Sequence, residues 1–280
     1  MQTKIPEGLA RDVEPTKWGK ILLATPVVMT VIATLLAGLA SSEMTRAQYD
    51  RAYAAQLQSK AGDQWAYFQA KKLRGALAQN SRELLAATTD IHPVDNPALK
   101  NLPTPPVLNL DANLEAAVQA LAQEKPETEI TTLLKAVHDS SLATALQTAK
   151  DNARAFDADL APANQALDQL EKALPAGDKS AARDLTAARM RFLAARYNAE
   201  AGLNQSIANL YELQVRKINL SAERHHRRSG KFFFGMLAAQ AAVIVSTFAI
   251  AAQKRSFLWS LAAVAGLAAI IFAIYVYLRV

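Results

Sequence analysis

Three apolar segments around a long polar middle constrain this chain more than any other feature. They occupy residues 21–40, 232–252 and 257–278, and none of them contains a charged side chain. An α-helix of about 20 apolar residues is long enough to cross the roughly 30 Å hydrocarbon core of a bilayer. The sequence therefore predicts an all-α membrane protein with three transmembrane helices.

The polar middle starts and ends beside apolar segments, so both of its ends are expected at the same membrane face. Residues 41–90 and 179–231 contain no proline, and each stretch has about 50 residues. Helices of this length span roughly 75 Å at 1.5 Å per residue. We expect an ascending and a descending stem helix that pair as a long antiparallel hairpin. A short tail, residues 1–20, precedes the first span.

Residues 91–178 connect the two stem helices. Prolines are frequent in residues 92–106 and prevent a helix there, which predicts a crossing or an ordered loop. Further helices are expected at three places: residues 111–123, 127–160 and 163–174. Because acidic residues outnumber basic ones by 14 to 7 in residues 90–179, these helices are predicted to form a small acidic cap at the far end.

The formal charge of +6 is unevenly distributed. Basic residues outnumber acidic ones by 7 to 4 in residues 41–89 and by 10 to 4 in residues 180–231, the two stretches that join the spans. Basic stretches beside a bilayer favour anionic head groups, whereas a nucleic-acid site would place the basic surface on the exposed end. The chain has no cysteine, which excludes disulfides and thiolate metal sites.

The first stem carries two apolar stripes at helical spacing. One consists of Ala54, Leu57, Ala61, Trp65 and Phe68. The other consists of Ala66, Ala70, Leu73, Leu77 and Leu84. Two narrow stripes predict two helical neighbours. On the second stem, Leu185, Phe192 and Ala199 recur every seven residues, which is typical of a coiled coil.

An aromatic cluster is expected at matched heights on the two stems. Trp65 lies about 24 residues after the first span, and the same distance before the second span falls at Ala208. The predicted packing cluster therefore contains Trp65, Tyr67, Phe68, Ile207, Leu210 and Tyr211. An aromatic ligand pocket is the functional alternative to this packing interpretation.

Several blocks of the sequence resemble a known family. They are DQWAYFQAKK at 63–72, YELQVR at 211–216 and RHHRRS at 224–229, followed by FFF at 232–234. These blocks resemble an uncharacterised family of bacterial inner-membrane proteins that is described only as a domain of unknown function. The resemblance covers residues 41–80 and 190–280 and leaves out residues 90–180. It implies the three-span architecture and a bacterial origin, and it implies no catalytic residue.

A basic cluster directly before the second span is the predicted lipid-binding site. Arg224, Arg227, Arg228 and Lys231 have the spacing i, i+3, i+4 and i+7, which places all four on one helical face. Such a face suits lipid phosphates, and each cation near an anionic surface contributes about 1 kcal/mol. A topology signal that only fixes orientation is the alternative, and the two interpretations are compatible.

Catalytic motifs are absent from the sequence. The four histidines are His92, His138 and the adjacent pair His225 and His226, whose side chains diverge on a helix. Arginines beside that pair oppose a metal ion, and the sequence contains no HExxH, GxSxG or glycine-rich phosphate loop. We therefore expect no enzyme activity, no metal, no cofactor and no nucleic acid as a partner.

Two classes of function remain from the sequence. The first is a membrane-anchored helical scaffold that assembles with itself into a homo-oligomer through stems and spans. The second is an accessory subunit of a larger inner-membrane transport or respiratory complex. The sequence gives two conflicting signals for orientation. Lys17, Lys20, Lys254 and Arg255 favour an amino terminus and a 253–256 hairpin on the inside, whereas the basic cluster at residues 224–231 favours a stem on the inside. The denser cluster favours a cytoplasmic stem.

Overall fold

The computed structural model of this protein describes residues 17–251 and 255–279. The regular structure within these ranges is helical throughout, which confirms the all-α fold expected from the sequence. The chain divides into two compact units. Met1–Arg51 and Leu220–Val280 form one, which we call the anchor unit, and Ala52–Asn219 form the other, which we call the stem unit.

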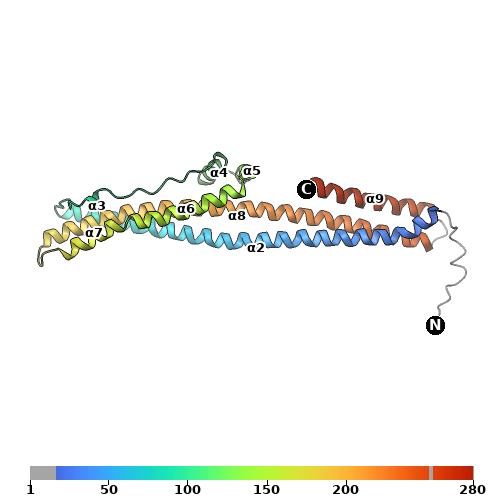
Figure 1. The fold of residues 1–280 in the computed structure, drawn as a ribbon, viewed down its shortest axis with the longest axis horizontal. Helices are drawn as coiled ribbons and strands as arrows, with labels where there is room; N and C mark the ends of the chain where they lie inside the picture. Colours follow the sequence, from blue (N-terminus) through green and yellow to red (C-terminus); the bar gives the residue numbers. More distant parts are fainter. Residues whose placement is uncertain (1–16, 252–254, 280) are drawn as a thin grey trace, which may run out of the picture. The chain divides into compact units, whose positions relative to one another are not determined.

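Two long helices supply residues to both units. Helix α2 runs over Lys17–Thr88 and helix α8 over Lys179–Ala251, so each contains an apolar segment and a stem without interruption (Figure 1). Their length follows from the sequence, because α8 contains no proline and α2 contains only Pro26, within its apolar part. Each expected stem therefore continues as one helix into the adjoining apolar segment.

Two of the described helices are long and apolar enough to cross a membrane. They are the described parts of α2 and α8, Ala24–Thr88 and Lys179–Ala249. The third expected span is helix α9, Arg255–Arg279, in which the described apolar stretch Ser260–Phe272 is shorter than a span requires. The third span therefore stays a prediction. The predicted tail at 1–20 lies mostly outside the described residues.

Many buried residues of the anchor unit are small, and many of its large apolar residues are exposed. Its buried residues include Ala33, Ala40, Ala239, Ala242, Ala249, Ala262 and Ala269. Its exposed residues include Val27, Val31, Leu35, Phe234, Phe248, Leu261, Val264 and Ile271. Helices that meet through small residues approach closely, and outward large apolar residues suit a lipid environment. A Cβ on Gly266 of α9 would lie 2.8 Å from the Met29 sulfur of α2, so a larger residue there would require the flexible end of the Met29 side chain to shift.

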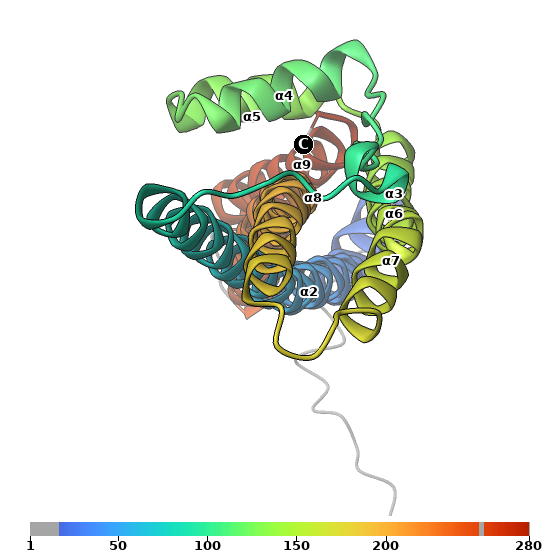
Figure 2. The ribbon, with the colours of Figure 1, turned by 90° about the vertical axis from the view of Figure 1, so that its left-hand side faces the viewer.

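The core of the stem unit lies between α8 and two helices that run along it. These are α6, Asp139–Asp159, and α7, Ala161–Lys172, which lie beside α8 in both views (Figures 1 and 2). The buried cluster consists of Leu99, Phe156, Leu160, Ala163, Leu167, Leu185 and Phe192. The predicted helix at 163–174 begins earlier, at Ala161, with Pro162 in its first turn, where a missing N–H has no cost.

Helices α4, Ala112–Ala122, and α5, Glu127–Ala136, form a short helical pair (Figure 2). The structure confirms the predicted helix at 111–123, and an Asp111 carboxylate oxygen accepts a hydrogen bond from the Leu114 N–H over 2.9 Å as its N-cap.

The single helix predicted at residues 127–160 was wrong. The chain is extended at Val137 and His138, and the new helix α6 begins at Asp139. Val137 is buried together with Ile130 and Leu134 of α5. Val137 lies three residues after Leu134 and ends the buried apolar face of α5.

The acidic helices lie along α8 rather than at the end of the hairpin. Their carboxylates form four ion pairs with α8, and the later two use residues nearer the start of α8: Glu127 with Arg216, Asp139 with Lys217, Asp157 with Arg196, and Glu171 with Arg189. The predicted position of the cap was therefore wrong. Much of the basic excess of α8 neutralises this acidic segment. Exposed ion pairs contribute little stability individually, so their main effect is to fix the register.

A proline-rich crossing follows α2 and contains one short helix that was not predicted from the sequence. Helix α3, Pro97–Lys100, begins at Asn96, whose side-chain oxygen accepts a hydrogen bond from the Ala98 N–H over 2.9 Å. An Asn followed by Pro was the available signal, because these residues favour the N-cap and first position of a helix. At the start of α8, Gly177 has φ of +92°, a conformation that glycine adopts without strain.

Candidate functional site

The aromatic block of the first stem is held against α8 by a hydrogen bond. The Trp65 Nε1–H donates to the Glu212 carboxylate over 2.6 Å, and the Trp65 ring meets Phe68 edge to face at 5.5 Å. Both rings are half-buried. The contact joins position 65 to position 212, so the two stems are paired at the matched height that the sequence indicates.

The predicted aromatic cluster is only partly assembled. Ile207, Leu210 and Tyr211 are buried as expected, but Tyr67 is 56% exposed and does not belong to the core. Its position on α2 turns it away from α8, because adjacent residues on a helix are about 100° apart. The Tyr211 ring instead receives the Lys150 ammonium of α6, 5.0 Å from the ring centroid. The site is a packing cluster rather than an aromatic pocket.

Charged residues continue this pairing along the stems. Lys71 of α2 forms an ion pair with Glu200 of α8 and lies 5.1 Å from the ring centroid of Tyr197. Arg196 donates to the same Glu200 carboxylate over 2.5 Å. Sequence reasoning missed these partners, because only the register of the two helices brings position 71 to position 200.

The second apolar stripe of α2 remains uncovered within the protomer. Leu73, Leu77 and Leu84 are 62%, 56% and 68% exposed, and Ala66, Ala70, Asn80 and Ala87 between and beside them are also exposed. We call these seven residues the outer seam. Their spacing alternates between four and three residues, which is the a/d pattern of a coiled coil. Within the chain, α8 contacts a different face of α2, because a Cβ on Gly75 would meet the Asn198 side chain of α8 at 3.2 Å.

The predicted lipid-binding residues lie in the anchor unit and differ in their surroundings. Arg224 and Arg227 are exposed, and the Arg227 Nε–H donates to Glu223 over 2.9 Å, which lowers the pKa of that carboxyl group. Arg228 is half-buried, and its buried Nε has no hydrogen-bond partner in the described structure. The Lys231 ammonium lies 5.6 Å from the Tyr275 ring centroid of α9.

Two polar contacts join α2 and α8 beside this basic cluster. The Ser229 hydroxyl donates to the Ala40 carbonyl oxygen over 2.7 Å, and His225 Nδ1 lies 2.5 Å from a Glu43 carboxylate oxygen. Glu43 was not a predicted site residue. These contacts hold the face that carries the basic cluster in a defined orientation on α8.

Among the described residues, no three His, Asp or Glu side chains gather as metal ligands. His92 lies against Asp184, and His225 lies against Glu43. The expectation that the protein binds no metal or cofactor stays a prediction.

The comparisons with known proteins identify a family. The family described as Domain of unknown function (DUF4337) matches residues 22–165, more than half of the 280-residue chain. The match includes the block at 63–72 and extends over residues 90–165, so leaving these residues out of the resemblance was wrong. No curated protein and no solved structure matches the chain. The chain therefore belongs to the DUF4337 family.

Proposed function

We propose that this protein is a non-enzymatic, membrane-anchored scaffold that assembles into a homo-oligomer through the outer seam. The observation that supports this proposal is the exposed a/d stripe on α2, with Leu73, Leu77 and Leu84 uncovered in a single chain. Exposed contiguous apolar surface favours association, and a heptad stripe favours another helix as the partner.

A second copy of the chain is the partner that best fits this seam. Chains inserted in the same orientation hold their seams at the same height above the membrane, so parallel pairing needs no adjustment of register. Asn80 occupies one d position of the seam, where a buried amide needs a hydrogen-bond partner, and the equivalent amide of a second parallel chain supplies one.

Cross-linking tests this arrangement directly, because the chain has no cysteine. In membranes, Asn80→Cys should give a disulfide-linked dimer under mild oxidation, since parallel pairing brings equivalent d positions together. The matched control is Gln79→Cys, which alters the neighbouring exposed amide outside the seam. Equal cross-linking at both positions, or none at Asn80→Cys, contradicts the proposed interface.

The alternative function, an accessory subunit of a larger inner-membrane transport or respiratory complex, predicts a different composition. Native mass measurement after mild solubilisation distinguishes the two proposals. A mass that is a multiple of one chain supports the scaffold, and a stoichiometric foreign protein supports the accessory subunit.

We further propose a bacterial inner-membrane location with α9 as the third span and the stem unit in the cytoplasm. The outward large apolar residues of α9, such as Leu261, Val264 and Ile271, support the third span. The basic cluster at 224–231 supports the orientation, because basic residues beside a span favour the cytoplasmic side. Labelling of single cysteines in intact cells tests it, since a cytoplasmic stem is protected from an impermeant reagent.

Anionic lipid is the proposed partner of the basic cluster. Replacing Arg224, Arg227, Arg228 and Lys231 with Gln should weaken association with phosphatidylglycerol by about 2 to 4 kcal/mol, with a smaller loss at high salt. The measurement is the lipid retained by the purified protein from mixed phosphatidylglycerol and phosphatidylcholine bilayers.

The control for this measurement replaces four exposed lysines of the stem unit with Gln: Lys60, Lys72, Lys135 and Lys172. It removes the same charge and should leave lipid retention unchanged. Equal retention in the two variants would show that the basic cluster is only a topology signal.

A further inference from the structure

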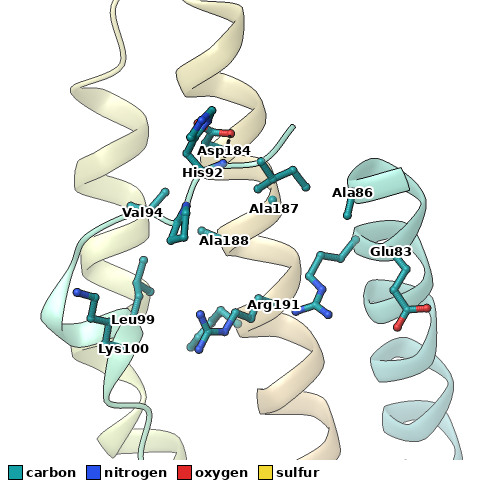
Figure 3. Close-up of a pocket in the computed structure, with 14 residues that line it drawn as sticks. Glu83, Ala86, His92, Val94, Leu99, Lys100, Asp184, Ala187, Ala188 and Arg191 are labelled. Atoms are coloured by element: carbon teal, nitrogen blue, oxygen red, sulfur yellow. Dashed lines mark hydrogen bonds and ion pairs between the residues drawn. The ribbon is translucent and has the colours of Figure 1, made fainter. Parts of the chain in front are cut away.

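A groove in the stem unit lies between α2, α8 and the crossing that follows α2. In Figure 3, Glu83 and Ala86 of α2 lie on one side of α8, and Val94 and Leu99 of the crossing lie on the other. The groove encloses a cavity of about 260 Å³. Its apolar lining includes Ala86, Ile91, Val94, Leu99, Ala188 and Phe192.

Most charged groups that line the groove already have partners. Lys100 pairs with Asp95 at 2.6 Å, and the Glu83 carboxylate accepts a hydrogen bond from Gln79 over 2.9 Å. The Asp184 carboxylate accepts a hydrogen bond from the His92 backbone N–H over 3.1 Å. That bond lowers the pKa of Asp184, so the carboxylate stays ionised at neutral pH.

Two arginines of the groove remain without an acidic partner. Neither Arg82 of α2 nor Arg191 of α8 forms an ion pair with a carboxylate in the described part of the chain. Arg82 is half-buried and Arg191 is exposed, so both guanidinium groups border the apolar cavity while solvent still reaches them. No sequence pattern assigns a role to either residue.

We propose that this groove binds a small carboxylic acid with an apolar body, such as a medium-chain fatty acid. A guanidinium group presents a planar fork that matches a carboxylate, and the apolar lining accepts the hydrocarbon part. The charge also fits, because the lining contains Arg82, Lys100 and Arg191 against Glu83 and Asp184. This leaves one positive charge in excess, which a monoanion neutralises. The proposal is independent of self-assembly.

The crossing supplies a position-specific measurement of binding. It closes one side of the groove and is tied to α8 by the His92 to Asp184 hydrogen bond. A bound ligand that contacts the crossing suppresses its local opening and slows its amide hydrogen exchange. The full-length protein in nanodiscs should therefore show slower exchange in residues 91–102 when octanoate is added. Octanoate that only partitions into lipid does not protect this segment.

Three related compounds test which part of octanoate the groove recognises. Octanol has the same chain without the charge, octylammonium has the opposite charge, and acetate has the charge without the chain. We expect protection by octanoate at concentrations at which the other three give none. Protection that octanol gives equally overturns the carboxylate part of the proposal, and protection that acetate gives equally overturns the apolar part.

Two variants test the residues. Arg82→Gln together with Arg191→Gln should weaken octanoate binding by about tenfold or more, because charged hydrogen bonds are lost. Ala86→Phe fills the groove from an exposed position on α2 and should abolish binding. The control Arg154→Gln alters an exposed arginine outside the groove and should leave binding unchanged. The proposal is overturned if octanoate does not slow amide exchange in residues 91–102 of the unmodified protein. It is also overturned if octanoate slows this exchange in both groove variants as strongly as in the unmodified protein.

Discussion

Replacing Leu73 and Leu77 together with Glu converts the proposed oligomer into single chains in the membrane. Each leucine contributes about 1.5 to 3 kcal/mol when it is fully buried, and both copies of the chain lose it. The new carboxylates also repel their equivalents across the interface. The association constant should therefore fall by at least about a thousandfold, measured as mass against protein concentration in nanodiscs.

A matched control separates the seam from a general effect of charge. Lys72→Glu together with Gln79→Glu places carboxylates on the same stretch of α2, at exposed positions outside the outer seam. This variant should keep the mass of the unmodified protein. Circular dichroism should show equal helix content in both variants, because all four positions are exposed. An unchanged mass after the leucine replacements contradicts the seam as the interface.

Truncation of Phe156 should cause the largest loss of stability that we expect from a single substitution. This ring is 1% exposed and lies in the buried cluster shared by α6, α7 and α8. Removing a buried aromatic ring leaves a cavity and costs about 3 to 5 kcal/mol. The free energy of unfolding of Phe156→Ala, measured with denaturant in detergent, should fall by this amount.

The control for this measurement is Val107→Ala, in the crossing of the same unit. Val107 is 85% exposed, so its truncation should change the free energy of unfolding by less than about 0.5 kcal/mol. A similar small change for Phe156→Ala would mean that α6 and α7 do not pack on α8 as the structure shows.

Local sequence patterns predicted the long elements well. The stretches without proline at 41–90 and 179–231 form continuous helices with the adjoining apolar segments, because a helix persists where no residue removes its hydrogen bonds. The break between α5 and α6 escaped prediction, because no glycine or proline marks it. Extended backbone at Val137 and His138 makes the break, and nothing in the local pattern of residues marks it.

The candidate sites also contain some features that local sequence predicts and others that depend on packing. Helical spacing places Arg224, Arg227 and Arg228 on one face, and this follows from the sequence alone. Glu223 lies one turn before Arg227 on the same helix, so this contact also follows from the spacing, whereas Glu43 of α2 reaches His225 only once the two helices are paired. The groove with Arg82 and Arg191 could not be predicted, since its walls come from three separate parts of the chain.

The sequence by itself determined the helical class, the apolar segments and the two stripes of α2, because each follows from the order of residues along one helix. The tertiary structure decided which stripe is covered. Trp65 and Phe68 pack toward α8, whereas Leu73 and Leu77 remain exposed. It also placed the acidic helices along α8, since a charge pattern gives the sign of a partner but not its position. Register between distant segments depends on packing and ion pairs across the chain, which no local pattern contains.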